Sequence, residues 1–256
     1  MTSSLLDRYF QSLAERLETV RSTQAEAIAR AAEHSADSIA VGKLVFTFGT
    51  GHGALPALET FPRTGTVVGF RPIVESTMIS FHHVWGDMGA RQYRFIHAQE
   101  GYGKAIMRSH QVDPADTMIL FSHSGINAVI MDIALECKER GLKVVGVTSI
   151  PHSSSTPSRH SSGKRLFEVA DVVIDTGIPK ADAALQIDGL EHPVGASSTS
   201  VTIAIAHAIV SLTAEKLVER GIKPYVMVNP NTTGKEAANR QNDENYEELW
   251  RRLKAR

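Results

Sequence analysis

This sequence contains a single cysteine and carries almost no net charge. Cys137 alone cannot form an internal disulfide framework or a multi-cysteine zinc site. It lies within a helical pattern, where we interpret it as a small core hydrophobe. The formal net charge of −1 at pH 7 argues against a dedicated binder of nucleic acid or of a membrane surface, because such proteins usually carry a basic patch.

Long apolar runs are also missing. The first residues, M-T-S-S-L-L-D-R-Y-F, contain no stretch able to act as a signal peptide. No segment approaches the roughly 18 apolar residues that are needed to cross a bilayer. We therefore expect a cytoplasmic protein with no membrane partner.

The length and the composition are typical of one enzyme-sized globular domain. Hydrophobic residues make up 42% and charged residues 21% of the 256 residues. No internal repeat or second domain boundary is visible. We expect a single domain over residues 1–256, with N-terminal helices in 1–42, an α/β core in 43–220 and a C-terminal extension in 221–256.

A glycine-rich turn follows the first predicted strand. Residues 44–48 are apolar, β-branched or aromatic except for Thr47, and residues 54–61 continue as a helix. Glycine lets the backbone approach a ligand closely, and the first free amides of a helix attract anions. The spacing G-x-G-x-G is not the dinucleotide fingerprint, and a plain tight turn is the alternative. The candidate ligand-binding residues here are Gly49, Thr50, Gly51, His52 and Gly53.

A serine-rich turn repeats this arrangement later in the chain. Residues 117–121 predict a buried strand and residues 128–140 a helix, with S-H-S-G-I-N between them. Serine hydroxyls can donate to phosphate or sugar oxygens, and Asn127 stands where a helix N-cap belongs. A serine-rich cap that only holds its own helix is the alternative. The candidate ligand-binding residues are Ser122, His123, Ser124, Gly125 and Asn127.

Five predicted strands alternate with helices along the chain. The strands are residues 44–48, 66–70, 117–121, 143–148 and 172–175. This order indicates an α/β fold with a mainly parallel sheet. A ligand of such a fold binds beyond the carboxyl ends of the strands, where both turns lie.

The remaining segments are predicted with less definite roles. We expect helices over residues 4–42, 72–88 with His82 and His83, 101–110, 166–170 and 236–252. A hydroxyl-rich run at 195–200 opens a long apolar helix over 201–220, expected in the core or at a dimer seam. Residues 226–228 favour a last short strand or an extended arm. The polar segment 149–164 reads equally as a disordered linker or as a mobile active-site loop.

Three pieces of the sequence together resemble the sugar isomerase (SIS) domain family. They are the F-G-x-G-H-x turn at 48–53, the S-x-S-G-x-N turn at 122–127 and the S-S-T-S helix start at 197–200. The segments I-D-T-G-I-P-K-A-D-A-A-L at 174–185 and N-R-Q-N-D-E-N-Y at 239–246 are similar to a subfamily of stand-alone SIS proteins of uncharacterised substrate. The resemblance spans residues 5–253.

The resemblance implies a three-layer α/β/α sandwich with a five-stranded parallel sheet that binds a phosphorylated sugar. The phosphate-binding roles of the family then fall on Ser122, Ser124, Asn127, Ser197, Ser198 and Thr199. Family members are commonly dimers or tetramers with sites near subunit interfaces, so a homo-oligomer is expected. One position departs from the family pattern, because Gly53 stands where a serine is usual. The ligand contact from that turn is therefore in question.

An isomerase of this family needs a base that carries a proton between two carbons through an enediol. Glu59 is the leading candidate, since it lies on the helix launched by the glycine turn and related isomerases place a Glu there. Glu100 and Glu75 are the runners-up. Three histidines are candidates for ring opening, in the order His52, His123 and His207, the last because phosphoheptose-type relatives use a His on that helix. Asp182 could hold a sugar hydroxyl.

Three functions compete at this stage. The first is an aldose–ketose sugar-phosphate isomerase, and the second a lyase, deaminase or etherase that acts on an amino-sugar phosphate. The third is a non-catalytic phosphosugar sensor, which no visible output domain supports. We expect no cofactor and no metal for an enediol route, although some phosphoheptose relatives bind zinc and the sequence has 11 histidines, so zinc stays open. Fold alone does not decide among these chemistries.

Overall fold

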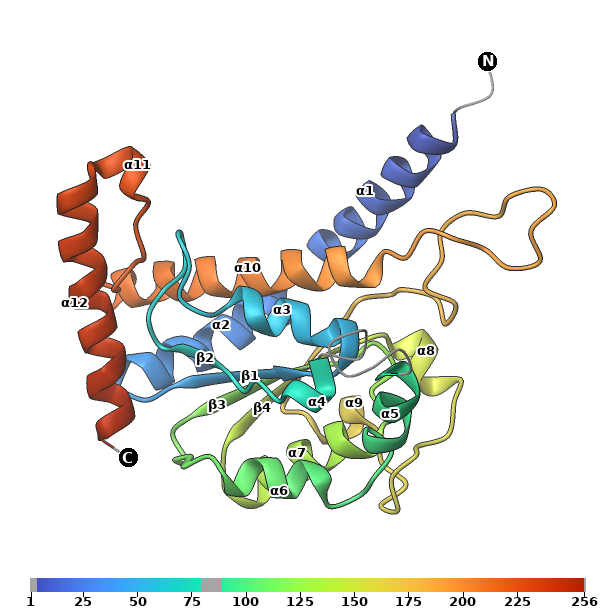
Figure 1. Ribbon diagram of the computed structural model, residues 1–256, viewed down its shortest axis with the longest axis horizontal. Coiled ribbons are helices and arrows are strands. Elements are labelled where there is room, and N and C mark those ends of the chain that lie inside the picture. The colour runs from blue at the N-terminus through green and yellow to red at the C-terminus, as the bar shows by residue number, and fades with distance from the viewer. Residues whose placement is uncertain (1–3, 80–88, 256) are drawn as a thin grey trace.

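A five-stranded sheet forms the centre of the computed structural model, which describes residues 4–79 and 89–255 (Figure 1). The strand order is β2-β1-β3-β4-β5, and all neighbouring strands are parallel. The strands are β1 (Val45–Gly49), β2 (Phe70–Pro72), β3 (Thr117–Phe121), β4 (Lys143–Thr148) and β5 (Val172–Asp175). The predicted α/β class and the five-stranded parallel sheet are confirmed.

The strands supply side chains alternately to two hydrophobic cores, one on each face of the sheet. In β3, Ile119 and Phe121 belong to one core, and Met118 and Leu120 belong to the other. Every residue of β3 is buried. A strand covered on both faces carries apolar residues at nearly every position, which is why these segments could be recognised as short apolar runs.

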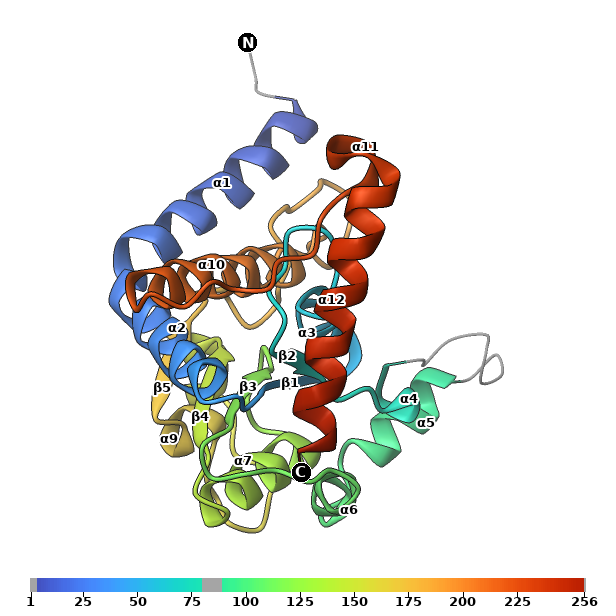
Figure 2. The ribbon, with the colours of Figure 1, turned by 90° about the vertical axis from the view of Figure 1, so that its left-hand side faces the viewer.

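Helices cover both faces of the sheet and complete the three predicted layers (Figures 1 and 2). One core includes side chains of α1 (Leu5–Thr23), α2 (Ala25–Ala40), α3 (Ala54–Glu59) and α10 (Ser198–Glu219). The other includes side chains of α4 (Ser76–Ile79), α5 (Gly89–Ile96), α6 (Tyr102–Arg108), α7 (Ala128–Glu139), α9 (Leu166–Val169) and α12 (Lys235–Lys254). The short helices η1 (Gly51–Gly53), α8 (Ile150–Ser154) and α11 (Pro230–Thr233) lie in connections.

The C-terminal helix α12 lies at the end of the sheet where the strands begin (Figure 1). The buried guanidinium of Arg252 donates from Nη1 to the carbonyl oxygens of Ile39 and Lys43, both at 3.0 Å. It also donates from Nε to Glu248 at 2.7 Å. These contacts leave the opposite end of the sheet, where the strands finish, for a ligand. The prediction that residues 1–256 form a single domain stays a prediction.

Two predicted boundaries between residues 66 and 88 were wrong. The second strand begins at Phe70 rather than residue 66, because Gly69 has φ +128° and interrupts the extended run. Val67 instead forms an isolated antiparallel bridge with Val226, and in the same predicted strand the Met227 amide donates to the Thr66 carbonyl at 3.0 Å. The predicted helix over 72–88 begins at Ser76, as α4, rather than at Pro72, which belongs to β2, and residues 80–88 with His82 and His83 lie outside the described residues. Helix α5 was not predicted.

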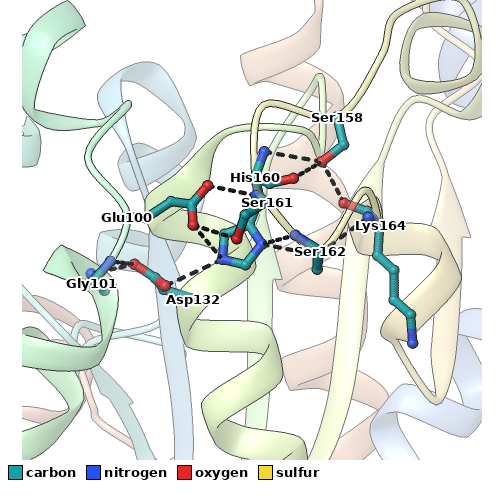
Figure 3. Close-up of polar contacts among 9 residues, drawn as sticks. Glu100, Gly101, Asp132, Ser158, His160, Ser161, Ser162 and Lys164 are labelled. Atoms are coloured by element: carbon teal, nitrogen blue, oxygen red, sulfur yellow. Dashed lines mark hydrogen bonds and ion pairs between the residues drawn. The ribbon is translucent and has the colours of Figure 1, made fainter.

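The polar segment 149–164 is not a structureless linker. It begins with α8, where the Ser149 hydroxyl accepts from the His152 amide at 3.1 Å. Further along, His160 lies between α7 and the segment itself, with Nδ1 2.9 Å from Ser162 Oγ and Nε2 3.4 Å from Asp132 Oδ1 (Figure 3). Asp132 is buried and also accepts from the amides of Gly101 and Gly103. These contacts tie the segment to the domain core.

Helix α10 has the length and apolar composition of a membrane-spanning helix, contrary to the expectation that no segment approaches that length. Its 18-residue window has a mean hydropathy of 1.6, and 44% of that window is buried inside the protein. Core helices of proteins without a membrane segment pass the same test. Val201, Ile205 and Ile209 of α10 pack into the core shared with α2 and the sheet, so we interpret α10 as a core helix.

The single cysteine is buried, as predicted. Cys137 is 0% exposed on α7, and burial raises the pKa of its thiol to about 12. Roughly one thiol in ten thousand is then ionised at pH 8. We expect Cys137 of the folded protein to remain unmodified by Ellman's reagent at pH 8, and to react fully in 6 M guanidinium chloride. Stoichiometric reaction of the native protein within minutes would contradict this burial.

Candidate functional site

The candidate site is a cavity at the carboxyl ends of β1 and β3. Strand β1 lies between β2 and β3, so the connections that follow β1 and β3 leave in opposite directions and open a crevice between them. A cavity of about 280 Å³ occupies this place. It is lined by Thr50, His52, Gly53, Tyr93, Phe121, Ser122, His123, Ser124, Asn127, His152, Asp182, Ser198, Thr199 and Thr202.

The glycine turn packs against the end of β3. A Cβ atom at Gly53 would lie 2.7 Å from the carbonyl oxygen of Phe121, and one at Gly49 would lie 1.9 Å from the carbonyl oxygen of Gly53. Contacts this close cannot be accommodated without moving the backbone. The turn therefore excludes the serine expected at position 53, and its contribution to the cavity comes from the backbone and from Thr50 and His52.

The serine turn is held by its own hydrogen bonds. The amide of Gly125 donates to Ser122 Oγ at 3.1 Å, and the amide of Ser122 donates to the Val147 carbonyl at 3.0 Å. Asn127 occupies the N-cap position of α7 as predicted, but its side chain makes no capping bond. Its Oδ1 instead accepts from Arg159 at 3.1 Å. The N-terminus of α7 and a guanidinium thus give this part of the cavity a positive character.

The N-terminus of α10 is capped by a carboxylate from the same chain. Asp182 Oδ1 accepts from the amides of Ser197 and Ser198 at 3.1 and 2.9 Å, and Oδ2 accepts from the Ser198 hydroxyl at 2.5 Å. These are the groups that the family pattern assigns to phosphate. Because these groups already donate to the Asp182 carboxylate, they are not available to an anion in this structure. Of the predicted hydroxyl run at the start of α10, Thr199 also lines the cavity.

Two histidines pack against each other in the cavity wall. The rings of His123 and His152 lie edge to face, with centroids 4.7 Å apart. Both ring nitrogens of His123 and Nδ1 of His152 are buried without a hydrogen-bond partner among the described residues. Burial lowers the pKa of both imidazoles below their ordinary value. Burial therefore favours the neutral form of both rings.

Three predicted catalytic residues lie outside the cavity lining. Glu59 ends α3 and pairs with Arg63 and with His207 Nε2, the latter at 3.3 Å. Burial alone would raise the pKa of Glu59, but the hydrogen bonds from Arg63 and His207 outweigh it and hold the pKa below its ordinary value, which is opposite to the raised pKa typical of a carboxylate base. Glu100 accepts from the amide and hydroxyl of Ser161 at 2.5 and 2.6 Å (Figure 3).

Comparison with known proteins decides the family. The model of the family described as SIS domain matches residues 8–149, more than half of the chain. This chain belongs to the SIS domain family. A UPF0309 protein of Halalkalibacterium halodurans is 33% identical over 93% of this chain and 96% of its own length. A UPF0309 protein of Geobacillus kaustophilus is 33% identical over 95% of both chains.

Solved structures share the fold of this SIS protein at low sequence identity. The phosphoheptose isomerase from Francisella tularensis superimposes with a TM-score of 0.52 and 16% identity, covering 83% of this chain and 100% of that one. The phosphoheptose isomerase from Neisseria gonorrhoeae gives 0.51 and 15%, covering 80% and 95%. At such identities the likeness shows the fold alone.

The SIS cavity combines predicted residues with four that were not predicted as site residues, namely Tyr93, Phe121, His152 and Thr202. Tyr93 comes from the unpredicted helix α5, and its hydroxyl donates to Thr50 Oγ1 at 3.3 Å. Thr202 lies one turn inside α10 from the predicted hydroxyl run. His152 follows the carboxyl end of β4, and that position was a signal that could have identified it, because the residues that follow β1 and β3 also line the cavity. Among the described residues, no group of three His, Cys, Asp or Glu side chains is placed to hold a metal.

Proposed function

We propose that this SIS protein binds a phosphorylated sugar in the cavity between β1 and β3. The observation that carries the proposal is the serine turn, whose hydroxyls and following helix N-terminus face one end of the cavity. Phosphate would bind there, with Ser122, Ser124 and Asn127 as donors and Arg159 as the nearby cation. The sugar would extend toward Asp182 and Thr199.

We further propose that the reaction is the interconversion of an aldose and a ketose phosphate. Glu59 is the proposed base, oriented by His207, and His52 is the proposed group for ring opening. Glu59 lies about six residues along α3 from the glycine turn, or roughly 9 Å at 1.5 Å per residue. Its side chain is 33% and that of His207 40% exposed. The Glu59–His207 pair is thus accessible to a sugar phosphate that is bound in another subunit. Glu100 is not included, because Ser161 already engages its carboxylate.

The position of Glu59 supports a homo-oligomer in which one subunit completes the site of another. Leu55 and Leu58 lie on α3, Phe61 follows it, and the three residues are 43%, 36% and 47% exposed. Apolar patches of this kind mark interaction sites. We expect a dimer or tetramer by light scattering. Phe61→Glu should shift it to monomer, whereas Val41→Glu, a matched change at a residue 65% exposed elsewhere, should not. A wild-type monomer at micromolar concentration would contradict the assembly.

A phosphosugar sensor without catalytic activity is the second candidate. Among the described residues that line the cavity, Asp182 is the one carboxylate, and this carboxylate already caps α10. That observation favours the sensor. Proton NMR in D2O separates the two. An isomerase exchanges the proton on the carbon next to the carbonyl for deuterium and interconverts the two sugars, whereas a sensor shows binding without exchange. Release of ammonia or of an acid would instead indicate the deaminase, lyase or etherase chemistry.

A further inference from the structure

The two ends of the cavity differ in charge. At the α7 end, the amides that begin the helix and the Arg159 guanidinium on Asn127 give a positive character. At the α10 end, the Asp182 carboxylate already accepts the amides and hydroxyl that would otherwise attract an anion. A ligand that enters the cavity therefore meets a cationic end and an anionic end.

The Asp182 carboxylate is firmly placed. It receives three hydrogen bonds at 2.5 to 3.1 Å, two from amides and one from a hydroxyl. Asp182 is also the one non-glycine residue with a positive φ, +46°, in residues 4–79 and 89–255. Backbone in this region persists where surrounding contacts hold it, and the capping bonds supply those contacts.

Two histidines and one lysine lie near the Asp182 carboxylate in the sequence or in the cavity wall. The imidazoles of His123 and His152 line the cavity with Asp182, and burial lowers the pKa of each. Burial thus favours the uncharged form of each ring. Lys180 lies on the same connection but is exposed, where water and salt screen its charge.

We propose that Asp182 is a specificity-determining residue, which restricts the cavity to sugar monophosphates whose other end is uncharged. The inference rests on the proposed function, in which the phosphate binds at the serine turn. A second phosphate or a carboxylate at the far end of the ligand would lie beside Asp182 with like charge, and like charges in a partly enclosed site repel strongly. Sugar bisphosphates and sugar-acid phosphates should bind about tenfold to a hundredfold more weakly than neutral-ended monophosphates.

The test compares two affinities in one variant. Asp182→Asn retains Oδ1 to accept the α10 amides and tolerates a left-handed backbone, so the cap is kept while the charge is removed. The probes are fructose 6-phosphate with fructose 1,6-bisphosphate, and ribulose 5-phosphate with ribulose 1,5-bisphosphate, measured by calorimetric titration at constant ionic strength. The control is Asp188→Asn, which removes the same charge from an exposed residue of the same connection outside the cavity lining.

The expected result is a preference for monophosphate in the wild type and in Asp188→Asn, and a rise of at least tenfold in the bisphosphate-to-monophosphate affinity ratio in Asp182→Asn. An unchanged ratio in Asp182→Asn overturns the inference. So does a wild-type protein that binds both members of a pair equally. Both outcomes leave phosphosugar binding intact. A wild-type protein that binds neither member of either pair, and no other sugar monophosphate of four to seven carbons, contradicts the proposed function together with this inference.

Discussion

Gly125→Ala is expected to lower the free energy of unfolding by about 3 kcal/mol, the largest loss of stability that we predict for a single methyl group. Gly125 has φ +61°, where an alanine is strained. A Cβ there would also lie 2.7 Å from Thr148 Oγ1 and 3.2 Å from the Cβ of Leu166. The strain and the overpacking add, and the serine turn would have to move.

Gly177 provides a matched control for the backbone contribution. Its φ is +62°, and a Cβ there meets nothing within 4 Å. Gly177→Ala should therefore cost only the conformational strain, about 1 kcal/mol. In a chain of this length, the expected losses correspond to decreases in Tm of roughly 6–12 °C for Gly125→Ala and roughly 2–4 °C for Gly177→Ala. Equal decreases in the two variants would show that the serine turn is not packed as described.

Glu59→Gln is expected to reduce turnover of the sugar phosphate by about a thousandfold while binding is retained. Glutamine keeps the shape of the side chain but cannot accept the proton that an enediol route transfers. Because glutamine keeps the size of the side chain and the proposed phosphate contacts lie at the serine turn, the dissociation constant for the sugar phosphate should stay nearly unchanged. The measurements are kcat by coupled assay and affinity by calorimetry.

The other two candidate carboxylates serve as controls. Glu75 accepts from Thr77 Oγ1 at 2.8 Å and from the Tyr102 hydroxyl at 3.1 Å, and Glu100 is engaged by Ser161. Glu75→Gln and Glu100→Gln should retain most of the wild-type turnover. If Glu59→Gln keeps full turnover, Glu59 is not the base. If one of the controls loses it instead, that residue takes the role.

The fold was predictable because each strand carries its own signal. Strands β3, β4 and β5 begin and end where the sequence pattern places them, since both faces of a parallel sheet are buried and the strands are continuous apolar runs. The boundary of β2 was not predictable in this way. The run T-V-V-G-F looks uniform, and only the backbone conformation at Gly69 decides that pairing starts at Phe70.

The cavity was predictable where its residues follow strands directly. The glycine and serine turns meet because β1 and β3 are neighbours in the sheet, and parallel strands finish on the same edge. The role of Asp182 could not be read in advance, because it lies 15 residues before Ser197 in an irregular connection. Nothing in the local sequence indicates that its carboxylate folds back onto α10. The neighbourhood of His152 and His123 likewise depends on how α8 leaves β4.

Binding of a sugar phosphate is the central claim, and a thermal-shift measurement tests it most directly. The purified protein would be heated with phosphorylated C4 to C7 sugars, with the matching free sugars and with inorganic phosphate. A ligand specific for the native state stabilises it by about 2.7 kcal/mol at a hundred times its Kd, which raises the Tm of a chain this long by roughly 5–11 °C. We predict such a rise with at least one sugar phosphate and none with its free sugar. No rise with any phosphorylated sugar would contradict the account.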